Sequence, residues 1–272
     1  MAITTLSGGI SGIQPLPKVL SKTPTGGVAA GWYTTLWGFS GVPAAGAYDT
    51  TLNGVALSSP VTGQIPFTDP ASGNAYLARI TANNSNGGTL VLCDRLWHNG
   101  GYTITSTSAQ NSTTPTWPAR DVAGATSGDG VFLALEVSAG TGSAAPTVTI
   151  SYTNSAGTSG RTATQYRATA TSGTGITYLI NLQAGDTGVR SVQSLTLSAS
   201  WVSGTINLVA YREIARFELI SNNVPNTLDL VGACMPRMYA GSVPYFMWSD
   251  LASPATRSEE HTSELQSRET IS

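Results

Sequence analysis

The chain has 272 residues, of which 10% are charged and 40% hydrophobic, with a formal net charge of −2. Only Lys18 and Lys22 are lysines, and phosphate or anionic lipid binding needs a concentrated basic face. We therefore expect no direct nucleic-acid binding and no membrane partner. Apolar and aromatic residues recur at strand spacing, which disordered chains lack, so the length predicts one large all-β domain or two small ones.

The last sixteen residues differ in charge and composition from the rest of the chain. Residues 257–267 read RSEEHTSELQS, which is the in-frame translation of a short-read sequencing adapter. We interpret residues 257–272 as a non-native, adapter-derived tail and exclude them from fold reasoning. Two of the 13 basic and four of the 15 acidic residues lie there, so the other 11 of each sign balance. On this interpretation the native C-terminus is missing.

Residues 1–40 predict an extended N-terminal arm with an aromatic anchor. Glycine and proline punctuate its first thirty residues, and Trp32, Tyr33 and Trp37 follow in a compact segment. Large aromatic side chains are effective docking groups, so these three are candidate anchors on this domain or on a neighbouring subunit. The start, MAITTLSGGISG, has no basic region and no long apolar run. We expect no signal peptide and a protein made in a cytoplasm.

Residues 41–256 are predicted to form the β-domain, with regular structure beginning at Ala75. The Asn99-Gly100 pair favours a tight hairpin turn, since both positions tolerate positive φ. A short helix is expected over residues 226–232. The strands are expected near residues 75–82, 89–98, 101–109, 131–138, 147–153, 161–170, 176–183, 189–201, 205–220 and 244–249.

The clearest strand pattern lies between residues 147 and 219. Val148, Ile150 and Tyr152 alternate with threonine and serine, which predicts a half-buried antiparallel surface with small hydroxyls outside. Residues 131–138 are nearly all apolar, as in a strand buried on both faces. In residues 205–220 the apolar positions switch from even to odd numbers, which predicts a bulge or corner near residues 211–214. The fold class is all-β: an antiparallel β-sandwich, with a jelly-roll as one form of it.

Few residues could support catalysis. His98 is the only histidine outside the tail, and its place at the end of a predicted strand favours a surface or hairpin position. Cys93 lies in an apolar run, which favours a buried free thiol over a disulfide with Cys234. Two cysteines and one histidine cannot assemble a zinc site. We therefore predict no catalytic residue, no metal ligand and no cofactor.

Two acidic motifs are better explained as turns. Asp186-Thr187-Gly188 matches the core of aspartic proteases, but it occurs once and lies in a loop between strands. Gly128-Asp129-Gly130 with Asp121 lacks the alternating acidic ligands of a calcium loop. Five arginines on or beside strands are expected to form surface or inter-subunit ion pairs with nearby acids: Arg161, Arg167, Arg190, Arg212 and Arg216.

Six ordered blocks are distinctive together: CDRLWHNGG (93–101), WPARD (117–121), GDGVFLALEVS (128–138), TVTISYTNSAGTSGRTAT (147–164), LQAGDTGVRSVQSLTLSAS (182–200) and NLVAYREIARFEL (207–219). In these blocks the chain resembles a family of tailed-bacteriophage virion proteins encoded among head and structural genes. The resemblance extends from about Trp32 to the tail. It implies a location in the virion and carries no catalytic residues.

Two classes of function follow. The first is a non-enzymatic structural protein of a bacteriophage particle, a head, capsid-associated or decoration subunit, that assembles with other virion proteins as a homo-oligomer. The second is a host-recognition or carbohydrate-binding module of a tail or fibre. In that case Trp97, Trp117 and Tyr102 are candidate sugar platforms, although core packing is the favoured explanation for them. An enzyme ranks third.

Overall fold

Every element in the described part of the computed structural model is a β-strand, and every strand pairing is antiparallel. The predicted antiparallel all-β class is thus confirmed. No helix in this part is long and apolar enough to cross a membrane. The described residues are 7, 20–22, 24, 32–70, 73–84, 87–165, 172–221, 223–229 and 231–250.

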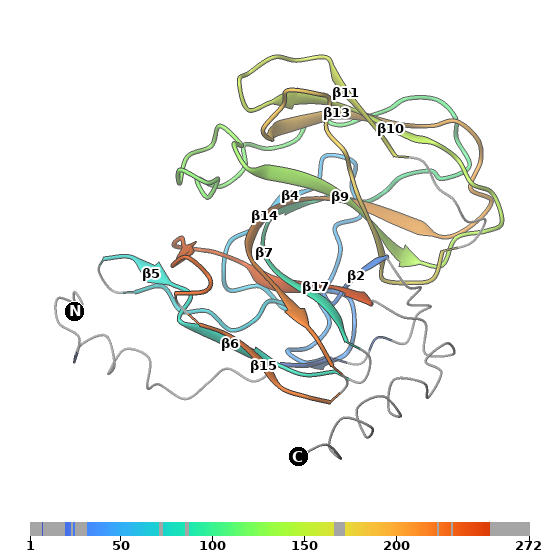
Figure 1. Cartoon of the computed structure of the whole chain (residues 1–272). Helices are drawn as coiled ribbons and strands as arrows, with labels where there is room; N and C mark the ends of the chain where they lie inside the picture. Colours follow the sequence, from blue (N-terminus) through green and yellow to red (C-terminus); the bar gives the residue numbers. More distant parts are fainter. Residues whose placement is uncertain are drawn as a thin grey trace, which may run out of the picture.

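Six strands form a closed barrel at the centre of the molecule (Figure 1). The strand at residues 205–219 pairs with the strand at residues 88–98, and this pairing closes the ring. Closure removes the free edges that an open sheet would have. The predicted sandwich did not include this closure: the largest sheet is a barrel. Around the ring the order is β14 (Thr205–Leu219), β9 (Val131–Ala139), β12 (Ile176–Leu179), β2 (Tyr33–Thr35), β17 (Pro244–Asp250) and β7 (Gly88–His98).

The long strand β14 makes closure possible because it pairs with β9 over its first half and with β7 over its second. Its register against β7 shifts after Ala210 and again after Glu213, so the predicted bulge is confirmed. Before the bulges, Leu208 faces the core above the barrel. Beyond them, Phe217 packs in a different core on the opposite side. The bulges thus keep apolar side chains buried as the strand coils around the ring.

A four-stranded sheet covers one side of the barrel (Figure 1, top). Its inward residues, such as Ile150 and Leu195, share one apolar core with Leu133 of β9 and Leu208 of β14. Along β10, buried residues alternate with half-buried hydroxyl residues, as the sequence pattern predicted. The strand order is β11 (Arg161–Gln165), β10 (Val148–Asn154), β13 (Val189–Leu197) and β8 (Gln110–Asn111).

Two small ribbons cover the other side of the barrel, and we call them, with the turns between them, the ribbon lobe. In one, β6 (Arg79–Ala82) pairs with β15 (Asn226–Asp229); in the other, β5 (Ala75–Tyr76) pairs with β16 (Arg237–Met238). Ile80 and Leu228 pack with Phe246 and Trp248 on the outside of the barrel. The helix predicted over residues 226–232 is therefore wrong, because pairing with β6 holds residues 226–229 extended and residues 231–232 lie in a turn. Three further strands are short: β4 (Val55–Ala56) pairs with β7, and β1 (Ser21–Lys22) forms a separate two-stranded sheet with β3 (Gly41–Val42).

The hairpin predicted at Asn99-Gly100 does not form, and residues 101–109 contain no strand. Asn99 is fully buried, and its Oδ1 accepts a hydrogen bond from the backbone N–H of Leu208 at 3.0 Å. Its Nδ2 donates to the carbonyl of Leu52 at 2.9 Å, while the Gly100 N–H donates to the Thr51 carbonyl at 3.0 Å. These hydrogen bonds to distant residues take the place of the local hydrogen bonds that a hairpin turn would form.

Candidate functional site

The three predicted anchor residues pack within their own chain. Trp37 lies fully buried in the barrel, and its Nε1 donates to the Ala47 carbonyl at 2.9 Å. Tyr33 belongs to β2, and Trp32 packs edge-on against Tyr178 with ring centroids 5.1 Å apart. The predicted arm boundary at residue 40 therefore needs correction, since β2 is a barrel strand. Residues 1–6 and 8–19 of that arm lie outside the described residues.

A buried ion pair lies inside the barrel. Arg95 of β7 donates from Nη1 and Nη2 to the two oxygens of Glu136 on β9, at 3.0 and 2.8 Å, and both side chains are 0% exposed. The guanidinium carbon lies 4.6 Å from the ring centre of Trp37 and 5.2 Å from that of Tyr245. Burial lowers the pKa of Arg95, but the charge and hydrogen bonds of Glu136, together with nearby Tyr245 and Tyr48, outweigh burial and raise this pKa overall, so the guanidinium stays protonated.

His98 belongs to the same network. It is 3% exposed, and its Nδ1 accepts a hydrogen bond from Arg95 Nε at 3.0 Å. The predicted surface position is therefore wrong. Burial, followed by the charge of Arg95, lowers the pKa of His98 to about 2, so the ring stays neutral at physiological pH. A general base must exchange protons near the working pH and reach a substrate, and His98 does neither.

A second buried carboxylate fixes the outside of the barrel. Asp94 accepts hydrogen bonds from Arg120 Nε and Ser242 Oγ, each at 3.0 Å, and from the Val243 N–H at 2.9 Å. Arg212 Nη2 lies 3.7 Å from the same carboxylate. Because Arg212 is buried here, the prediction that it forms a surface pair is wrong. Asp94 thus ties the loop before β9 to β7, β14 and the start of β17.

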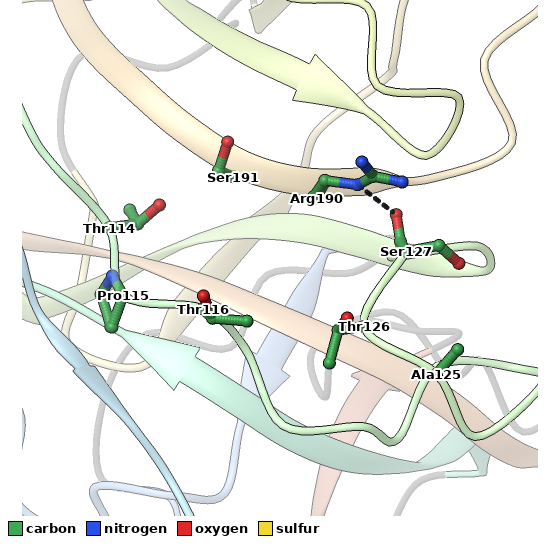
Figure 2. A pocket seen from close by; sticks show the side chains of 8 residues that line it. All are labelled: Thr114, Pro115, Thr116, Ala125, Thr126, Ser127, Arg190 and Ser191. Atoms are coloured by element: carbon green, nitrogen blue, oxygen red, sulfur yellow. Dashed lines mark hydrogen bonds between the residues drawn. The ribbon is translucent and has the colours of Figure 1, made fainter.

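A cavity of about 450 Å³ lies at the edge of the four-stranded sheet. Figure 2 shows the side chains that line it. It is surrounded by hydroxyl side chains and one guanidinium: Thr114, Thr116, Thr126, Ser127, Ser191 and Arg190. Arg190 donates to the backbone carbonyls of Ser127 at 3.4 Å and Ser155 at 3.0 Å. Hydroxyls and a guanidinium can hydrogen-bond a polar ligand. No acid, histidine or cysteine lines the cavity, so it offers no general acid, base or activated nucleophile.

The two acidic motifs are turns, as predicted. Asp186 accepts hydrogen bonds from Arg161 Nε at 2.9 Å, Tyr152 Oη at 2.6 Å and Asn154 Nδ2 at 2.7 Å. The bond from Arg161 is the main cause that lowers the pKa of Asp186 to about 2. Asp121 accepts bonds from its own loop, from Ser127 Oγ and the N–H groups of residues 123, 125 and 128. Both carboxylates stabilise loops through these hydrogen bonds.

The remaining candidate residues also have structural roles. Cys93 is a buried free thiol, as predicted, and Cys234 is exposed and free. Trp97, Trp117 and Tyr102 are all buried, which confirms core packing. Among the described residues, no three His, Cys, Asp or Glu side chains gather as metal ligands. Of the five arginines, Arg161 and Arg216 form the expected ion pairs, with Asp186 and Glu213, and Arg167 lies outside the described residues.

Sequence reasoning missed the buried network of Arg95, Glu136, Asp94 and Arg120. A signal was present: Asp94-Arg95 and Glu136 interrupt strands that are otherwise apolar, and buried charges require partners. Their pairing joins strands far apart in the chain, so only the barrel reveals which charges meet. No protein family, curated protein or solved structure matches the chain.

Proposed function

We propose that this chain is a non-enzymatic structural protein of a bacteriophage particle that works by assembly with copies of itself and with other virion proteins. One observation carries the proposal: exposed apolar side chains gather on the ribbon lobe and on the turn between β14 and β15 that leads into it. Val231 is 81% and Ile220 78% exposed. Three more large apolar residues there are roughly half exposed: Val224 in the same turn, Met235 just before β16, and Tyr76 of β5, which pairs with β16. Exposed apolar surface of this kind is typical of protein interaction sites.

The distribution of ionisable groups supports the same function. The buried acids and His98 hold the barrel and its loops, and no acid, histidine or cysteine lines the cavity in Figure 2. We also retain the predicted sandwich-like packing for one half of the molecule, where β10 and β13 share a core with β9 and β14. A rigid scaffold with one apolar lobe suits a virion subunit made in the host cytoplasm.

The test is the solution mass of the full chain, measured by light scattering over a range of concentrations. We expect a defined oligomer, and we expect the double variant Ile220→Asp/Val231→Asp to shift the mass toward the monomer. Val202→Asp is the matched control, because Val202 is 60% exposed but lies away from the ribbon lobe, between β13 and β14. A wild-type monomer at all concentrations would contradict the proposal.

The role of the N-terminal arm is tested by a deletion that spares the barrel. Removing residues 1–40 would delete β2 and open the barrel, so loss of assembly would report only unfolding. A deletion of residues 1–19 ends before β1 and leaves the barrel intact. We expect it to weaken assembly without changing the unfolding midpoint in urea.

A carbohydrate-binding module remains the second candidate because of the hydroxyl-lined cavity in Figure 2. Calorimetric titration with oligosaccharides tests it, using Arg190→Gln as the variant expected to lose binding. The burial of Trp97, Trp117 and Tyr102 removes the aromatic platforms on which this function was first predicted.

A further inference from the structure

A second cavity, of about 420 Å³, lies where the loop before β9 meets the end of the ribbon lobe. Arg120 lines it from the loop, Arg237 and Tyr239 line it from β16 and the residues after, and Ser58 completes the wall. Gly241 adjoins it with φ of +72°, and a Cβ there would lie 2.6 Å from Ser58 Oγ. Only glycine allows the backbone to approach the wall this closely.

Arg237 is held in place but not neutralised. Its Nη2 donates to Asn74 Oδ1 at 2.6 Å, and its guanidinium carbon lies 4.5 Å from the ring centre of Tyr239. Tyr239 is fixed in turn, because its hydroxyl donates to the Val122 carbonyl at 2.8 Å. Arg237 forms no ion pair with any carboxylate that the structure describes, so its Nε–H and Nη1–H donors lack an acceptor there.

The acids around this cavity already have partners. Asp94 accepts bonds from Arg120 and Ser242, and Asp121 is bonded to its own loop. Asp69 accepts a bond from the Gly241 N–H at 2.9 Å. The one cationic side chain of the cavity with unused donors is thus Arg237, oriented by Asn74 and backed by a tyrosine. A guanidinium N–H group without an acceptor can donate a short, charge-assisted hydrogen bond to a carboxylate oxygen.

We propose that this cavity is a carboxylate-binding site, and that it receives an acidic side chain of a neighbouring subunit. The second half of the inference rests on the proposed function. A protein carboxylate fits better than an acidic sugar, because the Tyr239 ring on which a sugar would stack is already contacted by Arg237 and, at 5.0 Å, by Arg212. The site also borders the apolar residues of the ribbon lobe, since exposed Met235 lies two residues before Arg237.

Site-resolved labelling of arginines by phenylglyoxal, read by mass spectrometry on the full chain, tests the site with acetate as the probe. We expect acetate to slow the labelling of Arg237 at least about threefold relative to chloride at equal ionic strength, by mass action. Exposed Arg79 serves as the internal control whose labelling rate stays unchanged. Equal protection of Arg237 and Arg79, or of neither, would overturn the carboxylate site.

The role in assembly is tested by light scattering of Arg237→Gln, Arg237→Lys and Arg79→Gln. Arg79→Gln removes the same charge from the same lobe. We expect Arg237→Gln to weaken assembly about tenfold, as loss of a charged hydrogen-bonded pair implies, Arg237→Lys to recover part of this, and Arg79→Gln to have no effect. Acetate protection with unchanged assembly of Arg237→Gln would overturn the subunit contact. A monomeric wild type would refute the proposed function while leaving acetate binding standing.

Discussion

The substitution Glu136→Gln tests whether the barrel core contains a true charge pair. It keeps the shape of the side chain but leaves the Arg95 guanidinium, at 0% exposure, without its counter-charge. Breaking a buried pair costs about 3–5 kcal/mol, and since the glutamine carbonyl can still accept one bond we expect about 3 kcal/mol. That is a large share of the roughly 5–15 kcal/mol that stabilises a typical domain.

The matched control is Glu213→Gln. Glu213 also makes a two-pronged pair, with Arg216 Nε and Nη2 at 3.0 and 2.9 Å, but its side chain is 35% exposed. Solvent screens such pairs, so this change should cost at most about 1 kcal/mol. Unfolding in urea, followed by tryptophan fluorescence, measures both. For Glu136→Gln we expect the midpoint to fall by roughly 1 M or more. Equal losses in the two variants would refute a buried, charged Arg95.

Three further predictions concern titration and thiols. His98, with its pKa lowered to about 2, stays neutral when folded, whereas the unfolded chain gains a proton below about pH 6.5. Between pH 7 and 5 the wild type should therefore lose about 2 kcal/mol more stability than His98→Asn in urea unfolding, and equal losses would show that His98 titrates in the fold. Asp186 contributes stability that is present above about pH 4 and is lost as the pH falls towards its folded pKa of about 2, so the thermal midpoints of wild type and Asp186→Asn should converge between those values. Burial raises the pKa of the Cys93 thiol, and Cys234 is exposed, so a thiol reagent such as DTNB should react with one thiol per native chain and with two in urea; two fast thiols in the native chain would contradict the burial of Cys93.

Local pattern explains much of the fold. The alternation of Val148, Ile150 and Tyr152 was enough to predict β10, and the change of parity within residues 205–220 was enough to predict the bulges in β14. These signals are readable because each strand must bury one face, whichever strand becomes its neighbour. The same reasoning identified Cys93 as a buried thiol and Asp186 as a turn residue.

Local pattern failed where a distant segment supplied a better partner than the neighbouring one. Asn99-Gly100 has the composition of a hairpin turn, but Thr51, Leu52 and Leu208 take up its hydrogen bonds. Residues 226–232 resemble a helix, but residues 226–229 pair with β6. Propensities for a turn or a helix are worth about 1 kcal/mol per residue, which a few long-range hydrogen bonds and apolar contacts exceed.

By itself, the sequence determined that this protein is antiparallel and all-β and where most of its strands run. Only the tertiary structure decided that β14 returns to β7 and closes a barrel, that β2 belongs to the ring, and that Arg95 meets Glu136 inside it. The physical reason is that strand alternation is fixed by neighbouring residues, whereas closure and charge pairing depend on contacts across many residues of chain. The cavity beside Arg237 is of the second kind, because segments around residues 58, 120 and 237 form its wall together.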